Sequence, residues 1–275
     1  MRKAAEAMFT DRDIPAPPSF RLLNPVGVWS LYLKEVRRFL NVYTQTIVAP
    51  VVTTLLFLAV FALALGGAVQ NVNGVPFLIF LTPGLIVMAM AQNAFANTSS
   101  SLVISKIQGN IVDVLMPPIA PGEFVFAYAL AGMTRGIVVG LVTWAGMALF
   151  VPLPVSNIWL ILYHAAMASL MLSLLGMLGG IWSEKFDQIA AVTNFVITPF
   201  SFLSGTFYSV SRLPEPFHTL AFYNPFFYMI DGFRGGVIGV HDVAPLQGVL
   251  VMAGVNLVLW LAVLALVQRG YRLKT

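Results

Sequence analysis

Arg135 and His164 are the only Asp, Glu, Lys, Arg or His residues inside the long apolar stretches of this sequence. An ion-coupled carrier normally binds its proton or cation at an acidic or other titratable group within the membrane. Neither residue is a carboxylate, so the apolar stretches give little support to ion coupling. We expect Arg135 to have a structural or gating role, with substrate contact as the alternative, and His164 to be a hydrogen-bonded packing residue.

A polar run, QNAFANTSSS at residues 92–101, interrupts one apolar stretch. Asn93 and Asn97 stand four residues apart in it and therefore share one face of a helix. Unpaired amides and hydroxyls each cost roughly a few kcal/mol in hydrocarbon, so these side chains should face the protein interior. Two interpretations remain open: the run lines a transport pathway, or it forms hydrogen bonds between helices.

A catalytic function has little support from the remaining polar residues. A membrane enzyme needs an acid, a base or a metal cluster near the interface. Glu215, His218, His241 and Asp242 form one grouping of such residues, but their spacing matches no metal site. The sequence has no cysteine and no glycine-rich phosphate loop of the Walker type. We therefore expect no cofactor or metal on this chain, and an ATP-driven motor must be another chain.

The composition is that of an all-α integral membrane protein. Hydrophobic residues make up 59% of the 275 residues and charged residues 9%, and the mean hydropathy is +0.86. Soluble domains carry about 25% charged residues. The runs are continuous and lack the alternation that a membrane barrel requires. The net charge of +4 is too small and too scattered to indicate nucleic acid binding.

The charge-free intervals predict six transmembrane helices, because crossing the hydrocarbon core takes about 20 apolar residues. The expected spans are residues 47–66, 77–101, 124–150, 158–181, 188–207 and 246–268. Lys and Arg gather in the N-terminal segment, in the C-terminal tail and in the loops on that same side. Both termini are therefore expected in the cytoplasm, with tails at 1–25 and 273–275 around a transmembrane domain at 26–272.

Residues 26–43 are predicted to form an amphipathic helix on the cytoplasmic interface. Its apolar face would hold Trp29, Tyr32, Leu33, Val36, Phe39, Leu40 and Tyr43. Lys34, Arg37, Arg38 and Asn41 would lie opposite and face anionic headgroups of the membrane lipid. The alternative is a helix of the soluble kind that packs on a partner.

The segment between spans two and three is longer than a turn requires. Residues 104–116 alternate apolar and polar positions at helical spacing, and Pro117, Pro118 and Pro121 would stop a short helix there. A rigid helix fixed between two spans could deliver a push to both of them. The other interpretation is a loop that only covers the end of the bundle.

Residues 208–245 are too apolar for a solvated loop and too interrupted to span. A re-entrant helical hairpin on the outer side, between spans five and six, satisfies both facts. Asn224 before Pro225 is a plausible helix start. Asp231 and Arg234 are spaced to pair across one turn, as a local contact rather than a binding site.

Several segments together match a known family of transport proteins. They are GNIVDVLMPP at 109–118, FLSGTFY at 202–208, Leu213-Pro214 and YNPFFYMIDGFR at 223–234. With the six-span order and the N-terminal helix, they resemble the permease subunits of ABC-2 type exporters over about residues 25–272. The resemblance is closest to bacterial drug, nodulation-factor and polysaccharide export permeases. The family often has Glu and Thr before the coupling Leu-Pro, whereas this chain keeps only the carboxylate, Asp113.

This resemblance implies a homodimer of permeases joined to two separately encoded ATPase subunits, which bind ATP and magnesium. The short helix would be the coupling helix that contacts the ATPase. The residues expected in that contact are Gln108, Asn110, Asp113, Val114, Leu115, Met116 and Pro117. The residues expected to line or gate the pathway are Asn93, Asn97, Arg135, Phe202, Phe207, Tyr223 and Phe226.

The expected function is ATP-driven export through the bacterial inner membrane by alternating access. Six spans of one 29.9 kDa chain leave little room for a conduit, and two-fold pairing is the commonest oligomer symmetry. Spans one, two and five would rearrange at the seam between two copies, and the outer hairpin would gate release. The resemblance implies an amphipathic substrate such as a drug, a lipid or a glycan. The alternative is a self-contained ion-coupled secondary transporter.

Overall fold

The computed structural model describes residues 24–65, 71–72, 74–210 and 213–272. Within these ranges, six helical segments are long and apolar enough to cross a membrane. They are Thr44–Ala64, Phe77–Ile107, Pro121–Ala148, Ile158–Trp182, Phe186–Leu203 and Pro245–Gln268. The predicted all-α membrane fold with six spans is confirmed. Residues 66–70 and 73 of the loop expected between spans one and two, and nearly all of the two predicted tails, lie outside the described residues.

The described elements follow one another as helices with one small hairpin of strands. The first span consists of η1 (Thr44–Val48), a π-helical turn, and α3 (Ala49–Leu65), and the fifth consists of α8 (Phe186–Val192), η2 (Thr193–Ile197) and α9 (Thr198–Leu203). The other helices are α2 (Pro25–Leu40), α4 (Phe77–Ile107), α5 (Ile111–Leu115), α6 (Pro121–Ala148), α7 (Ile158–Trp182), α10 (Phe217–Phe222), α11 (Pro225–Ile238) and α12 (Pro245–Gln268). Strands β1 (Asn71–Val72) and β2 (Val75–Pro76) pair antiparallel.

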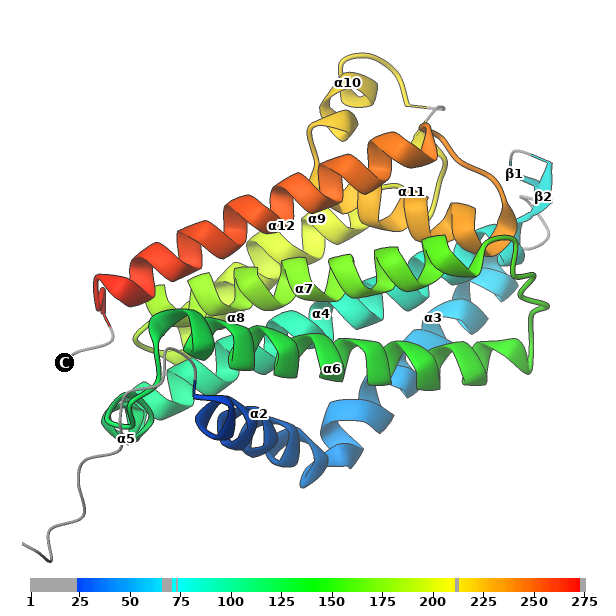
Figure 1. The fold of residues 1–275 in the computed structure, drawn as a ribbon. Helices are drawn as coiled ribbons and strands as arrows, with labels where there is room; N and C mark the ends of the chain where they lie inside the picture. The colour runs from blue at the N-terminus through cyan, green and yellow to red at the C-terminus, as the bar shows by residue number, and fades with distance from the viewer. Residues whose placement is uncertain (1–23, 66–70, 73, 211–212, 273–275) are drawn as a thin grey trace, which may run out of the picture.

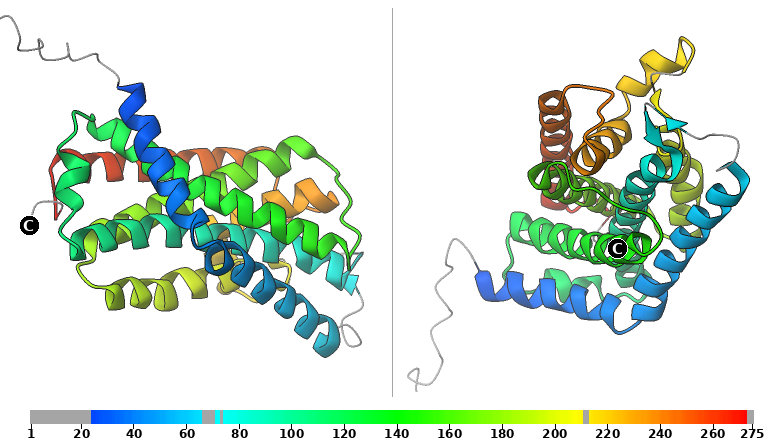
Figure 2. Two further views of the ribbon diagram at one scale, coloured as in Figure 1. Left: turned by 90° about the horizontal axis from the view of Figure 1, so that it is seen from below. Right: turned by 90° about the vertical axis from the view of Figure 1, so that its right-hand side faces the viewer.

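The long helices run side by side, with α4 in the interior (Figure 1). Helix α4 contacts α3, α6, α7 and α11, whereas α12 contacts α6, α7 and α11. Helix α2 crosses the bundle obliquely (Figure 2). Helix α5 and the C-terminus lie at one end, here called the α5 end, and α10 and the strands lie at the other, the α10 end (Figure 1).

Small residues allow the central helices to approach closely. A Cβ added to Gly176 of α7 would lie 2.2 Å from the Thr98 hydroxyl oxygen and 2.5 Å from the Phe95 carbonyl oxygen of α4. Glycine removes that obstacle, and small residues are typical of packed faces between membrane helices. The polar run of α4 therefore lies in a tight interface rather than on the surface.

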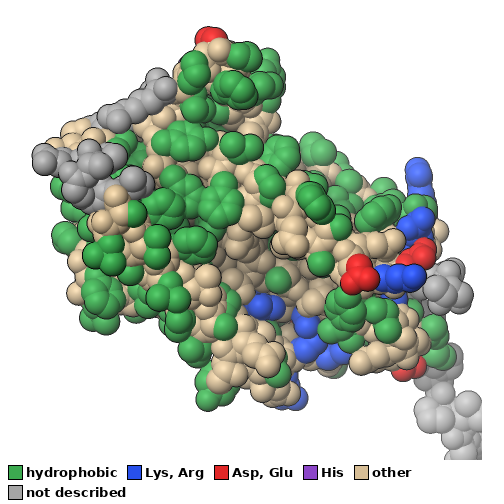
Figure 3. All heavy atoms as spheres, turned by 180° about the vertical axis from the view of Figure 1, so that it is seen from behind, with side chains coloured by type: hydrophobic (Ala, Val, Ile, Leu, Met, Phe, Trp, Pro, Cys, Tyr) green, Lys and Arg blue, Asp and Glu red, His purple; other side chains and the backbone are tan. Residues whose placement is uncertain are grey.

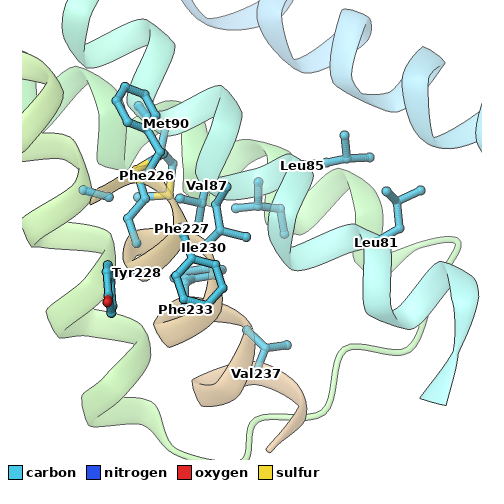
Figure 4. Packing of buried hydrophobic residues seen from close by; sticks show 14 of the residues in the cluster. Leu81, Leu85, Val87, Met90, Phe226, Phe227, Tyr228, Ile230, Phe233 and Val237 are labelled. Carbon is cyan, nitrogen blue, oxygen red and sulfur yellow. The ribbon is translucent and has the colours of Figure 1, made fainter. Parts of the chain in front are cut away.

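Helix α11 supplies the second part of the core, although it is too short to span. Its apolar side chains, among them Phe227, Ile230 and Phe233, pack against Leu85, Val87 and other residues of α4 (Figure 4). Asn224 caps its start by accepting a hydrogen bond from the Phe226 amide at 3.1 Å, as its position before Pro225 predicts. Helices α10 and α11 lie between spans five and six, where the re-entrant hairpin is predicted, and the re-entrant arrangement itself remains a prediction.

The short helix between spans two and three differs from its predicted extent. Residues 104–107 belong to α4, and the chain breaks at Gly109, whose φ of +71° is favourable only for glycine. Helix α5 therefore has five residues and begins at Ile111. Pro121 does not stop it but starts α6 at the first helical position, where a missing N–H costs nothing.

Prolines in spans one and five follow π-helical turns. Pro50 comes two residues after η1, and Pro199 comes two residues after η2. Proline removes a backbone donor, and π-turns are a known way of accommodating a local change in the hydrogen-bond ladder. The two stretches also share a pattern, TQTIVAP at 44–50 and TNFVITP at 193–199. Spans one and five thus contain the same local irregularity.

Candidate functional site

The predicted coupling segment, residues 108–117, projects at the α5 end. Met116 is 76% exposed, and Gln108, Asn110, Asp113 and Pro117 are exposed as well. Gln108 and Asn110 also bond to each other through their side chains at 3.2 Å. The polar groups of this segment are therefore available to a partner.

An apolar residue of α5 fixes this segment to the bundle. Ile111 is 1% exposed and lies in an apolar cluster with Leu31 of α2 and Phe124 of α6. Val114 is half-buried against the same cluster, and the side chain of Leu115 lies outside the described residues. A force applied to α5 therefore meets packed side chains of two other helices.

The start of α2 is bound to the chain that follows α5. The Glu123 carboxylate accepts hydrogen bonds from the Asn24 amide and, at 2.8 Å, from the Ala120 amide. The Asn24 side chain donates to the Pro118 carbonyl at 3.3 Å and accepts from the Gly27 amide at 2.9 Å, which caps α2. These bonds join α2 to the segment between α5 and α6. Neither Asn24 nor Glu123 was predicted from the sequence, although Asn before Pro25 and Glu after Pro121 are helix-start signals.

The end of α2 is bound to the polar run of α4 through Arg38. Its Nη2 donates to the Asn97 carbonyl at 2.7 Å and to Asn97 Oδ1 at 3.0 Å, and its Nε donates to Glu35 at 3.1 Å. The prediction that Arg38 faces lipid headgroups is wrong, because fully buried Glu35 and the Asn97 oxygens offer partners inside. Lys34 and Arg37 are exposed, as expected.

The buried face of α2 also differs from the predicted one. Leu31, Glu35 and Phe39 are buried, whereas Trp29 and Tyr43 are exposed. The three buried residues follow an i, i+4, i+8 line, and the acidic member of that line was not expected inside. The sequence does indicate a partner for the buried Glu35, because Arg38 stands three residues later, at a spacing that allows an ion pair on one helix.

Asn93 and Arg135 meet inside the bundle. Arg135 Nη2 of α6 donates to Asn93 Oδ1 of α4 at 3.0 Å, and each side chain is 8% exposed. Among the described residues, no carboxylate lies within salt-bridge distance of Arg135. Each asparagine of the polar run therefore accepts a hydrogen bond from a guanidinium group. Asn93 accepts from Arg135, and Asn97 accepts from Arg38.

Other members of the polar run bond between helices. Thr98 donates to the Ser173 carbonyl of α7 at 2.7 Å, and Ser173 donates to the Ala129 carbonyl of α6 at 3.0 Å. These bonds connect three spans, so interhelical bonding, one of the two interpretations of this run, is present. A pathway role for Asn93, Asn97 and Arg135 stays a prediction.

Basic residues gather beside this network. A depression of about 600 Å³ is lined by Ser30, Leu33, Lys34, Arg37, Arg38 and Asn41. Figure 3 shows Lys and Arg side chains at a hollow of the molecular surface, below a wide area of apolar side chains. Arg38 lines the depression and also reaches the polar run, so it connects the surface with the interior.

The predicted gating aromatics do not form one cluster. Phe202 and Phe207 stack with centroids 5.2 Å apart, and Phe207 stacks on Phe61 of the first span at 4.7 Å. Phe226 is buried and lies 6.0 Å from the Phe200 ring. Tyr223 is 80% exposed at the α10 end. Spans one and five therefore meet through stacked rings, and Tyr223 is apart from them.

Asp231 and Arg234 do not pair with each other as the spacing suggested. Asp231 accepts from the Asp242 and Val243 amides at 2.8 and 3.3 Å. Arg234 donates to the Gly205 carbonyl at 2.5 Å and lies 3.9 Å from the centroid of the Phe80 ring. Unpaired loop backbone groups attract both side chains, which hold the chain on either side of α11.

The acidic and imidazole grouping of the α10 end is dispersed. His218 pairs with Glu215 at 3.2 Å, whereas Asp242 accepts from Ser209 at 2.8 Å. The Thr219 hydroxyl, donating at 2.8 Å, lowers the pKa of the Glu215 carboxyl. No three His, Asp or Glu residues of the described ranges are placed to hold a metal ion. His164 is buried and bonds to the Leu160 carbonyl at 3.0 Å, as expected of a packing residue.

Comparison with known proteins identifies the family. The ABC-2 type transporter family matches residues 26–238. The chain belongs to the ABC-2 type transporter family. It is thus a transport permease of an ABC system, a multi-pass inner membrane protein whose family implies an ATPase partner.

Two relatives illustrate what this ABC-2 permease resembles. It is 35% identical to the inner membrane transport permease YadH of Escherichia coli (strain K12) over 254 residues, which cover 91% of this chain and 98% of that protein. It is 28% identical to nodulation protein J of Rhizobium leguminosarum bv. viciae, over 79% of this chain and 83% of that protein. Both matches include the coupling segment and the polar run within their broad coverage of the spans.

Proposed function

We propose that two copies of this permease form an export pathway driven by two separate ATPase subunits that dock on the coupling segment. The observation that carries this proposal is the exposed, polar coupling segment fixed by Ile111 to two other helices. ATP and magnesium would bind to the ATPase and not to this chain. The transported substrate would be amphipathic, like a drug, a lipid or a glycan, and would move outward by alternating access.

A continuous set of contacts supports transmission from the coupling segment to the spans. Glu123 joins the chain after α5 to the start of α2. At its other end α2 bonds through Arg38 to Asn97 of α4. A displacement of α5 would therefore shift α2 and the interior of the bundle together, because each joint is a charge-assisted hydrogen bond.

Exposed polar side chains support a second copy against spans one and five. Gln45 of η1 and Asn194 of η2 are exposed polar side chains within spans one and five. An amide that faces lipid is costly, so it is expected to meet protein or a watery cavity. A partner copy that covers both π-helical turns would supply such an environment and place the pathway at the seam.

The distribution of basic residues supports cytoplasmic placement of the α5 end. Lys106 and Arg272 lie at that end and bond to the last carbonyls of α7 and to Trp182. The same α5 end carries three further exposed basic residues, Lys34, Arg37 and Lys185. Because cytoplasmic loops are enriched in Lys and Arg, both termini would lie in the cytoplasm.

The docking proposal can be tested by affinity purification of the tagged chain from its own membranes. The wild type should bring down an ABC ATPase, identified by mass spectrometry. The double variant Val112→Asp/Met116→Asp should lose it, since both side chains are exposed and their replacement leaves the core intact. Phe217→Asp, an equally exposed apolar position at the α10 end, is the control and should retain the ATPase.

Two results would count against this function. Undiminished ATPase recovery with the Val112→Asp/Met116→Asp variant would show that docking occurs elsewhere. Transport by the purified chain alone in vesicles, driven by a sodium or proton gradient, would instead establish the ion-coupled alternative.

A further inference from the structure

Two guanidinium groups lie one helical turn apart on the polar run with too few acceptors. Asn93 and Asn97 share a face of α4 at i and i+4, and they hold Arg135 and Arg38 respectively. Glu35 is the carboxylate bonded to Arg38. Arg135 donates to an amide oxygen, and among the described residues no carboxylate lies within salt-bridge distance of it. The site therefore holds one positive charge more than it neutralises.

The unused hydrogen-bonding atoms of this site are mainly donors. Arg135 Nε and Asn97 Nδ2 are buried without a partner. The orientation of the Asn97 amide is set by Arg38, which takes its oxygen, so the nitrogen remains to donate. Glu35 Oε1 lacks a hydrogen bond, but it lies 3.8 Å from the Lys34 ammonium. Buried donors and an uncompensated cation are unfavourable unless an anionic acceptor joins them.

The position of the site fixes the kind of anion that can reach it. Arg38 also lines the basic depression on α2 together with Lys34 and Arg37, so positive charge surrounds the point where the network borders the surface. Helix α2 is amphipathic and exposes Trp29 and Tyr43, which are typical anchors at the level of lipid headgroups. An anion at this depth is the headgroup of an amphiphile or a free anion from the adjoining water.

We propose that Arg38, Arg135 and Asn97 form a binding site for the phosphate group of an amphiphile in the inner leaflet. This rests on the proposed function, since that places α2 on the cytoplasmic side, and it narrows the substrate class to anionic amphiphiles. The two guanidiniums would bind the phosphate oxygens, the Asn97 amide would donate a further bond, and Asn93 would position Arg135. Inorganic phosphate offers the same oxygens, so the experiment must separate the lipid headgroup from the free anion.

Native mass spectrometry of the purified full-length chain can test this site. The probes are phosphatidylglycerol, diacylglycerol with the same acyl chains, which lacks the phosphate, and inorganic phosphate as a competitor. Arg135→Gln and Arg38→Gln should each weaken phosphatidylglycerol binding about tenfold, as expected for loss of one charge-assisted contact. Arg269→Gln is the control, because Arg269 is exposed at the end of α12 and does not line the depression, and the affinity of this variant should change less than about twofold.

A second variant keeps the test valid if the arginine replacements do not fold. Asn97→Asp is nearly isosteric and places a carboxylate beside the guanidinium of Arg38. It should raise the unfolding temperature and abolish phosphatidylglycerol binding, because the site would then contain its own anion. Displacement by inorganic phosphate would show that the phosphate alone is recognised, and binding of the lipid without such displacement would assign the site to the lipid.

Three results would overturn the proposal. They are equal affinity for the two lipids, wild-type binding of phosphatidylglycerol by Arg135→Gln, or wild-type binding by Asn97→Asp. Recovery of the ATPase with the same variants separates this proposal from the function it rests on. Loss of lipid specificity with retained ATPase recovery affects the substrate site alone, whereas absence of the ATPase from the wild type affects the proposed function alone.

Discussion

Arg135 of α6 donates a hydrogen bond of 3.0 Å to Asn93 of α4, and more than nine-tenths of each side chain is buried. Asn93→Leu would remove the acceptor and leave the guanidinium among apolar groups. We expect the free energy of unfolding to fall by about 2 to 3 kcal/mol, the range for a lost bond to a charged group. Thermal or denaturant unfolding in detergent would measure this change.

The double variant Asn93→Leu/Arg135→Met is the control for that interaction. Replacing both partners by apolar groups of similar size removes the unpaired charge, so much of the lost stability should return. Simple addition of the two single losses would show that the side chains do not depend on each other.

Glu123→Ala should loosen the start of α2. Its carboxylate accepts from the backbone amides of Asn24 and Ala120, so both amides would lose their acceptor. We expect faster hydrogen exchange over residues 24–30 and a stability loss of about 1 to 3 kcal/mol, as for buried donors left unsatisfied. Glu184→Ala, at an exposed position near the same end, should leave this exchange unchanged. Unaltered protection of 24–30 in Glu123→Ala would contradict the contact.

Gly176→Ala should destabilise the central interface. Its new Cβ would come within 2.2 Å of the Thr98 hydroxyl and 2.5 Å of the Phe95 carbonyl, so α4 and α7 would have to separate. Overpacking of this kind typically costs about 1 to 3 kcal/mol, and it would appear as a lower unfolding temperature. Gly254→Ala in α12 is the control, because nothing lies within 4 Å of its added Cβ. Equal unfolding temperatures of the two variants would refute the close approach.

Arg234→Met should release the chain between α9 and α10. Arg234 is fully buried and donates to the carbonyls of Gly205 and Thr206, at 2.5 and 3.4 Å. We expect a stability loss of about 3 kcal/mol, because these carbonyls lose their partner, and faster hydrogen exchange over residues 203–208. Arg234→Lys should not restore the wild type, since an ammonium cannot reproduce the planar contact with the Phe80 ring.

Arg269→Met is the matched control for that position. Arg269 is exposed at the end of α12, so its replacement should leave both stability and exchange unchanged. Protection of 203–208 in Arg234→Met equal to that of the wild type would show that other contacts hold this segment.

The sequence by itself determined the membrane class, the number of spans and most of their ends. Span four was predicted at 158–181 and is found at Ile158–Trp182. The prediction succeeds because the length of an apolar run is a local property of the sequence, and the bilayer thickness sets the length that a spanning helix needs. The predicted coupling segment was placed in the same way, from prolines whose backbone preferences act within a few residues, whereas the break at Gly109 was not predicted.

Only the tertiary structure decided which partners the charged side chains take. Arg38 was expected at the lipid and reaches Asn97, 59 residues away in sequence, and Arg135 reaches Asn93 over 42 residues. Asp231 and Arg234 lie one turn apart on α11, yet they form hydrogen bonds with the backbone of two different loops. Spacing along a helix gives the face of a residue, but the partner depends on which unpaired donors and acceptors another helix brings to that face.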